Sequence, residues 1–235
     1  MQILRKIINA LWEFPCPLCD CDTPQSHDFN TFCNDCLKKL PMLSGKRCPG
    51  CGGELDGALE QCRQCLSMPP RPWSHAVSVL KMEGMGEKVI YQLKFSGNTA
   101  IARAIAEMAY PLLDNPDYKA CDMIVPVPLY WKRQQQRGYN QSEVLAKMLS
   151  RYLKIPVKTP LKRIRHTTRQ ATLSREERLK NLKGAFAVPK QPTVAGKKIL
   201  LIDDVLTTGS TLHACAEALN KAGAADIKVF TVARR

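Results

Sequence analysis

The sequence predicts an α/β protein, a doubly wound parallel sheet preceded by a small zinc-binding domain with four-cysteine metal sites. Two observations predict this organisation. Eight of the eleven cysteines form four C-x-x-C pairs before residue 66, and strand and helix patterns alternate from residue 73 onward. We place the boundary at the proline-rich stretch Met68–Pro72, which gives a zinc-binding domain over 1–70 and an α/β domain over 71–235.

The elements of the α/β domain follow from hydrophobic patterns. Continuous apolar runs are typical of strands buried on both faces, and apolar residues three or four apart are typical of amphipathic helices. The runs predict strands over His75–Leu80, Asp122–Pro128, Lys197–Ile202 and Ile227–Val232. The spacings predict helices over Gly86–Leu93, Ala100–Leu113, Ser142–Leu153 and Thr211–Lys221, with Gly223 ending the last one.

The four C-x-x-C pairs predict two structural zinc sites. Each pair places two thiolates on one tight turn, and two turns make a tetrahedral sulfur cage. The pairs are Cys16/Cys19, Cys33/Cys36, Cys48/Cys51 and Cys62/Cys65. Consecutive pairing joins the first pair to the second and the third to the fourth, and a crossed arrangement is the alternative. Four sulfur ligands leave no open position on Zn²⁺, so we expect structural metals, with Cys21 and His27 as bystanders.

Positive charge is concentrated in one segment of the chain. The formal net charge is +14, yet residues 1–72 are neutral, and residues 130–183 hold fifteen basic side chains against three acidic ones. Such a field favours nucleic acid or small molecules with several phosphates, a solvated surface being the alternative. No apolar run approaches the length of a membrane helix, and Met1–Phe14 lacks the features of a signal peptide, so we expect a cytoplasmic protein.

The segment Leu200–Thr211 predicts a site for a sugar phosphate. A buried strand ends in Asp203 and Asp204, and hydroxyl residues and one glycine lead into a helix, whose first N–H groups are unpaired. The candidate phosphate ligands are Thr207, Thr208, Gly209, Ser210 and Thr211. Carboxylates only accept hydrogen bonds and a ribose diol offers two donors, so ribose 5-phosphate satisfies both halves of the segment.

This segment resembles the phosphoribosyl diphosphate (PRPP) motif of type I phosphoribosyltransferases, in which paired acids hold the ribose hydroxyls and the loop holds the 5′-phosphate. Further motifs resemble the ComF family of bacterial competence and DNA-utilisation proteins. They are the cysteine pairs, the Pro-Pro-Arg-Pro-Trp linker, Leu93-Lys-Phe-Ser-Gly97, Val125-Pro-Val-Pro128, Arg137-Gly-Tyr-Asn-Gln141 and the C-terminal Ala-Arg-Arg. The resemblance implies a type I phosphoribosyltransferase-like fold that binds PRPP with Mg²⁺.

The resemblance also implies roles for two basic segments. The loop with Lys132, Arg133 and Arg137 takes the position that binds the diphosphate. The stretch 161–184 takes the position of a flexible arm that closes over PRPP. Arg165 and Arg169 are then catalytic candidates beside Asp203 and Asp204, and Gln170 resembles a family position.

The same segments favour single-stranded DNA, since a basic arm can bind a nucleic-acid backbone and Trp131 and Tyr139 either stack bases or pack. The DNA-binding candidates are Lys132, Arg133, Arg137, Tyr139, Arg163, Arg165 and Arg169. Our preferred hypothesis is a PRPP-binding protein of DNA uptake, natural transformation or use of DNA as nutrient, with proteins of the uptake machinery as further partners. The alternatives are a phosphoribosyltransferase on an unidentified acceptor base or nucleotide, and a zinc-organised interaction protein that senses PRPP.

Overall fold

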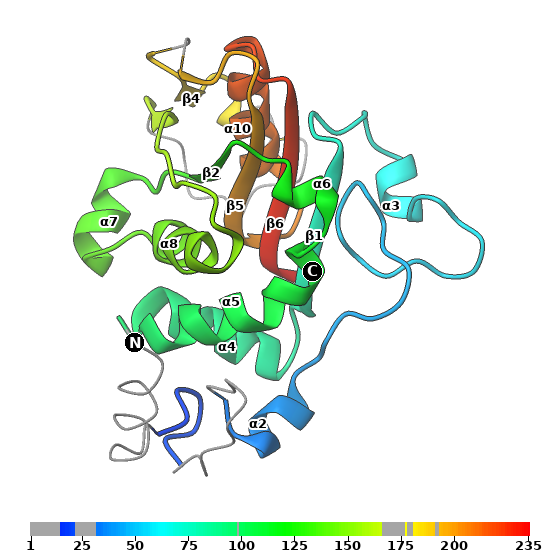
Figure 1. The fold of residues 1–235 in the computed structure, drawn as a ribbon, viewed down its shortest axis with the longest axis vertical. Coiled ribbons are helices and arrows are strands. Elements are labelled where there is room, and N and C mark those ends of the chain that lie inside the picture. Colours follow the sequence, from blue (N-terminus) through cyan, green and yellow to red (C-terminus); the bar gives the residue numbers. More distant parts are fainter. Residues whose placement is uncertain (1–14, 22–31, 98, 166–176, 178–180, 191–192) are drawn as a thin grey trace.

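Parallel strands form the central sheet of the protein in the computed structural model, which describes residues 15–21, 32–97, 99–165, 177, 181–190 and 193–235 (Figure 1). The strand order is β1-β6-β5-β2, and each neighbouring pair is parallel. Their bounds are His75–Lys81 for β1, Asp226–Arg234 for β6, Lys198–Leu206 for β5 and Met123–Pro126 for β2. The predicted doubly wound parallel sheet is confirmed.

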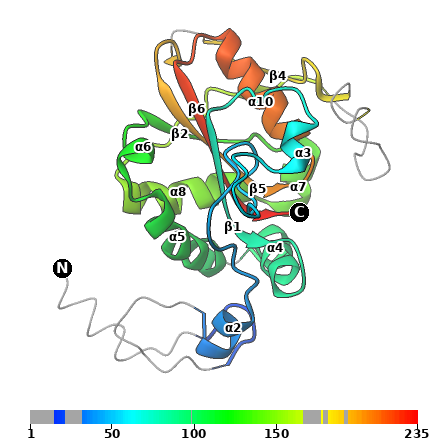
Figure 2. The same cartoon turned by 90° about the vertical axis from the view of Figure 1, so that its right-hand side faces the viewer.

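Helices cover both faces of this sheet, as Figures 1 and 2 show. One face packs against α4 (Met85–Phe95), α5 (Thr99–Leu113) and α8 (Gln141–Leu153), and the other packs against α10 (Ser210–Lys221). The side chains of β5 alternate between two apolar cores, because successive strand residues point to opposite faces. Leu200 and Ile202 join the first core, and Ile199 and Leu201 join the second.

Shorter elements connect these layers. They are α2 (Asn34–Lys39), α3 (Arg63–Leu66), α6 (Pro116–Lys119), α7 (Trp131–Arg137), β3 (Lys162–Arg163) and β4 (Phe186–Ala187). Strands β3 and β4 pair antiparallel and join the two ends of the basic arm, of which residues 166–176 and 178–180 lie outside the described part. Helix α7 occupies the segment expected to be a loop. It buries none of its residues and ends at Gly138, whose φ of 77° is in the left-handed region.

Strand β5 is longer than the sequence predicted. It continues past Ile202 to Leu206, because Val205 and Leu206 pair with Ala233 and Arg234 of β6. Asp203 and Asp204 therefore lie inside the strand, near its carboxyl end, instead of following it.

The two cysteine groups belong to different cores. Cys16, Cys33 and Cys36 pack in the core that contains α4 and α5, whereas Cys48, Cys51 and Cys65 pack in the α10 core with Trp73. A backbone hydrogen bond also joins the segment of the second of these groups to the sheet, because Ala76 N of β1 donates to Pro49 O at 2.7 Å. The boundary at residue 70 stays a prediction. None of the described helices has the length and apolar character needed to cross a membrane.

Candidate functional site

Two adjacent aspartates at the carboxyl edge of the sheet form the centre of the site. Asp203 is 9% exposed and Asp204 is 6% exposed. Asp203 Oδ1 accepts hydrogen bonds from Ser142 Oγ at 3.1 Å and from its neighbour's backbone N at 2.9 Å. Asp204 Oδ2 lies 2.8 Å from Lys94 Nζ, and its Oδ1 accepts from Val205 N. Both carboxylates are thus held by internal partners, which α8 and α4 supply.

Burial perturbs the protonation of this pair. Desolvation, followed by the charge of Asp204, raises the pKa of Asp203 to about 8. The hydrogen bonds from the backbone and from Ser142, together with the charge of Lys94, lower that pKa less than burial raises it. At neutral pH Asp203 is therefore largely protonated, so one of its oxygens can donate a hydrogen bond to a ligand while the other still accepts.

The loop that follows the acids has the geometry of an anion site. Gly209 adopts a φ of 76°, and α10 begins at the next residue. The hydroxyls of Thr208 and Ser210 lie 2.8 Å apart, and Ser210 N donates to Thr208 Oγ1 at 3.4 Å. Thr207 is exposed and Thr211 is half-buried. The five predicted phosphate ligands thus form one turn at the N-terminus of a twelve-residue helix, where free N–H groups and the helix dipole favour an anion.

Helix α7 places cations beside the acids. Burial lowers the pKa of Arg137, and the charge of Asp204 opposes that shift. The Arg137 guanidinium donates to Gln141 Oε1 at 3.0 Å. The Arg137 guanidinium also lies 4.9 Å from the centre of the Phe95 ring. Lys132 Nζ lies 5.5 Å from the centre of the Trp131 ring, at the other end of the helix. The predicted diphosphate loop is therefore a short helix, and its last residue, Arg137, lies within the electrostatic influence of Asp204.

The other predicted residues have different surroundings. Arg165 donates to Asn181 O at 3.0 Å and to Lys183 O at 2.8 Å, so its described hydrogen bonds stay within the arm. Arg163 lies over the rings of Tyr130 and Phe186. Arg169 and Gln170 lie outside the described residues.

Tyr139 packs rather than presenting its hydroxyl to a ligand. Its Oη donates to Leu93 O at 2.8 Å and accepts from Gly97 N at 3.3 Å. These two bonds fix the end of α4, the helix that carries Lys94. Of the two roles that the sequence left open for Tyr139, the structure favours packing.

Sequence reasoning missed Lys94 and Ser142, which hold the acids. Lys94 lies between Leu93 and Phe95 in the last turn of α4, and Ser142 is buried in the first turn of α8. A buried serine at a helix start was a weak signal, and nothing in the sequence pairs either residue with the acids. Their contacts arise only when both helices pack on the same face of the sheet.

The eight cysteines form the two groups expected from consecutive pairing. The first cysteine group is Cys16, Cys19, Cys33 and Cys36, the second is Cys48, Cys51, Cys62 and Cys65, and within each the sulfurs lie within 4.8 Å of one another. Cys19–Cys33 and Cys51–Cys62 sulfur distances are both 3.6 Å. Tetrahedral zinc with Zn–S bonds of ~2.3 Å separates its sulfurs by about 3.8 Å, so both groups fit Zn²⁺. Cys21 Sγ lies 3.2 Å from Cys19 Sγ but outside the four, and His27 is not described.

Comparison with known proteins places this geometry in a family. The phosphoribosyl transferase domain model matches residues 95–235. The chain is 35% identical to Competence protein F of Haemophilus influenzae, over 87% of the present chain and 91% of that protein. It is 36% identical to DNA utilization protein YhgH of Escherichia coli, over 80% of the present chain and 83% of that protein.

Among solved structures, one match is the glutamine PRPP amidotransferase from B. subtilis complexed with ADP and GMP. The match has 17% identity and a TM-score of 0.41, and covers 60% of the present chain and 30% of that chain. The assignment of the fold rests on the domain model and on the observed strand order.

Metal analysis of paired cysteine variants tests the zinc sites. We expect two zinc ions per wild-type chain, because both groups offer four thiolates. The double variant Cys16→Ser/Cys36→Ser should keep one zinc, and Cys16→Ser/Cys48→Ser should lose both. A crossed arrangement gives the reverse result for the two variants. Cys121→Ser changes a buried cysteine that belongs to neither group, so it is the control and should keep two ions.

Thermal melts across pH test the burial of Asp203. An aspartate pKa is about 3.9 in the unfolded chain and about 8 here, so the fold binds a proton that the unfolded chain does not. The free energy of unfolding therefore falls as pH rises from about 4 through about 8. Asp203→Asn removes the charge, and we expect its Tm to exceed that of wild type by at least about 2 °C at pH 8.

The same gain should shrink and disappear as pH falls below about 4, where the wild-type carboxyl becomes protonated in both states. Asp122→Asn, at an exposed site paired with Lys197, is the matched control and should show no gain at pH 8. An Asp203→Asn variant that gains nothing between pH 4 and pH 8 contradicts the buried, protonated carboxyl.

Proposed function

The chain belongs to the phosphoribosyl transferase domain family and to its ComF-type group of competence and DNA-utilization proteins, and on that premise we propose that it binds PRPP and single-stranded DNA. Asp203 and Asp204 accept hydrogen bonds from the ribose hydroxyls, and the loop 207–211 holds the 5′-phosphate. The role is in the uptake of DNA, in natural transformation or in the use of DNA as nutrient.

One observation carries the ligand proposal: two carboxylates are buried side by side directly ahead of an anion-binding loop. Removing a charged carboxylate from water is costly, and a fold that needed only stability would place apolar side chains there. Among the described residues their side-chain partners are one hydroxyl and one ammonium group. A ribose diol offers two neutral donors in place of Lys94, while the phosphate reaches the loop. Lys94 thus keeps the site charge-balanced until ligand binds.

The cations of α7 extend this site toward a diphosphate. Arg137 lies in the electrostatic field of Asp204, and Arg133 is close enough to affect the pKa of Arg137. Mg²⁺ prefers oxygen ligands, and the buried Asp204 Oδ2, which has no hydrogen-bond partner beyond its ion pair, fits that preference. Bound Mg²⁺ would neutralise charge on the diphosphate, and the arginines would orient it.

The DNA proposal is supported by exposed aromatic side chains among these cations. We name Tyr91, Phe95, Trp131, Lys132, Arg133 and Arg137 the aromatic–cation surface. Tyr91, Phe95 and Trp131 are 64%, 57% and 55% exposed, and α7 buries no residue at all. Core packing therefore does not account for this helix. Rings on which bases stack, alternating with charges that neutralise phosphates, are typical of proteins that bind single strands.

Transfer of the phosphoribosyl group to an unidentified acceptor is the second candidate. Arg137 beside the acid pair favours it, since a cation there would stabilise departing pyrophosphate. Pyrophosphate release from PRPP in the presence of candidate bases tests this activity. Pyrophosphate release with any acceptor supports transferase activity. If no base causes release, only the binding role remains.

Calorimetry with ribose 5-phosphate and with inorganic phosphate tests the ribose site. Asp204→Asn replaces one acceptor oxygen by a donor, so we expect its affinity for ribose 5-phosphate to fall about tenfold or more. Its affinity for inorganic phosphate, which needs only the loop, should stay unchanged. Asp122→Asn serves as the control. If Asp204→Asn and wild type bind ribose 5-phosphate with equal affinity, the proposed ribose site is wrong.

Filter binding of single-stranded DNA over a salt series tests the aromatic–cation surface. Lys132→Gln and Arg133→Gln should each reduce the slope of log K against log salt by about 0.7, because each removes one phosphate contact. Trp131→Ala should weaken binding roughly tenfold without changing the slope, because it removes stacking alone. Lys221→Gln, at the exposed end of α10, is the control. Binding that is insensitive to salt would be incompatible with this surface.

A further inference from the structure

The linker after the second cysteine group brings an arginine to the phosphate loop. Arg71 Nη1 donates to Thr208 O at 3.2 Å. A Cβ atom on Gly209 would lie 2.8 Å from the same Nη1, so the guanidinium rests directly on the loop glycine. An alanine at position 209 would make this guanidinium shift, and the positive φ there is the stronger reason for glycine.

Among the described residues, this guanidinium has no anionic partner. It offers five N–H donors, yet its described hydrogen bonds reach one carbonyl oxygen and the sulfur of Met68. Its Nε is buried without a partner. No described Asp or Glu makes an ion pair with it, in contrast to Lys94, which Asp204 neutralises. A half-buried, unneutralised cation at an anion-binding loop has the charge that a phosphoryl group requires.

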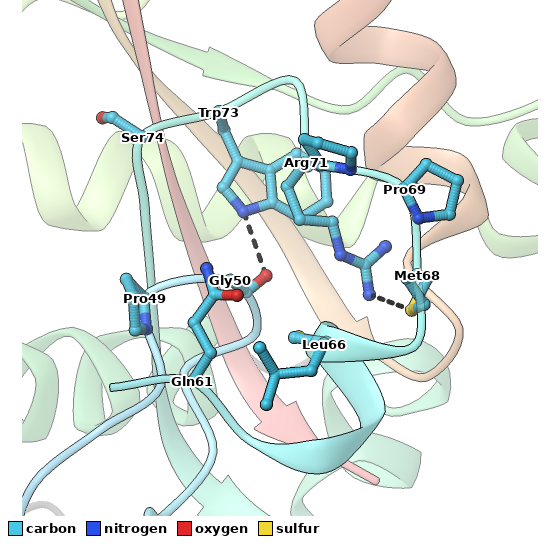
Figure 3. Close-up of a pocket in the computed structure, with 11 residues that line it drawn as sticks. Pro49, Gly50, Gln61, Leu66, Met68, Pro69, Arg71, Trp73 and Ser74 are labelled. Carbon is cyan, nitrogen blue, oxygen red and sulfur yellow. Dashed lines mark hydrogen bonds between the residues drawn. The ribbon is translucent and has the colours of Figure 1, made fainter. Parts of the chain in front are cut away.

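Trp73 and Met68 of the linker lie close to the Arg71 side chain, and Trp73 contacts Gly50 of the second cysteine group's segment, as Figure 3 shows. The Arg71 guanidinium lies 5.1 Å from the centre of the Trp73 ring, and Trp73 Nε1 donates to Gly50 O, between two cysteine ligands, at 3.1 Å. Pro69, Pro70 and Pro72 restrict the backbone on both sides. On the far side of the linker, Asn220 of α10 donates to Pro72 O at 3.0 Å.

A cavity of about 390 Å³ borders the other side of this arginine. Its wall includes Arg71, Trp73, Met68, Leu66 and Gly50, and Figure 3 shows these residues around it. Open space there lets the guanidinium reorient without displacing the core. The arginine is therefore anchored through its backbone and its stacking on Trp73, while its charged end can follow a ligand in the loop.

We propose that Arg71 is a phosphate-binding residue of the loop 207–211, supplied by the linker and held in place by the second cysteine group. This inference rests on the proposed function, and it adds a ligand contact from outside the matched domain at residues 95–235. The arginine donates to the 5′-phosphate of the phosphoribosyl ligand. Binding of the sugar phosphate thereby depends on the zinc-binding part of the chain.

Titration calorimetry of full-length variants tests Arg71 with ribose 5-phosphate and inorganic phosphate as probes. Arg71→Gln should lower the affinity for both about tenfold or more, because each loses a charge-assisted contact. Arg71→Lys should recover most of the loss, because it keeps the charge. Arg63→Gln, which removes an exposed charge from α3 of the same cysteine group, should bind as wild type does. Zinc content and Tm should match wild type in all variants.

The outcomes separate this inference from the function on which it rests. If wild type and Arg71→Gln bind each probe with the same affinity, Arg71 is not a phosphate ligand, and the proposed ribose site is unaffected. A lysine variant as weak as the glutamine variant shows that Arg71 only braces the loop, which also overturns the inference. Wild type that binds neither probe removes the proposed function and this inference together. Asp204→Asn differs from Arg71→Gln, since it should lose affinity for ribose 5-phosphate but keep its affinity for inorganic phosphate.

Discussion

The burial of two adjacent carboxylates in one strand constrains the rest of this structure. Strand β5 is central, and Asp203, Val205 and Leu206 near its end pair with β6, so Asp203 and Asp204 lie within the sheet with little contact with water. Such a pair is stable only with protons or cations supplied nearby. The fold meets this need with a proton on Asp203, the hydroxyl of Ser142 and the ammonium of Lys94. The helices α4 and α8 therefore do more than cover the sheet.

Distant parts of the chain also bring positively charged side chains to this edge of the sheet. Helix α7 brings Arg137 toward the acids, and the proline-rich linker brings Arg71 to the loop behind them. The second cysteine group supports that linker and is also tied to β6, because Arg234 Nε lies 3.2 Å from Cys51 Sγ. A zinc site of four thiolates has no open position for chemistry. Its contribution to the proposed function is to fix the positions of charged side chains.

The sequence was informative where the relevant pattern is local. Runs such as Lys197–Ile202 predicted the buried strands, and the spacing of the cysteines predicted both groups of four. The end of β5 was missed because aspartates are rare inside strands, and their pairing depends on β6. Helix α7 was missed because its polar sequence has no apolar period. Lys94, Ser142 and Arg71 could not be found, since only the packing of distant segments brings them to the acids and the loop.

A crystal structure of the protein with PRPP and Mg²⁺ tests the central claim most directly. We expect the ribose hydroxyls to lie within hydrogen-bonding distance of Asp203 and Asp204, Lys94 to have moved away from Asp204, and the 5′-phosphate to occupy the loop 207–211. A ligand bound elsewhere while the ion pair between Lys94 and Asp204 stays closed would contradict it.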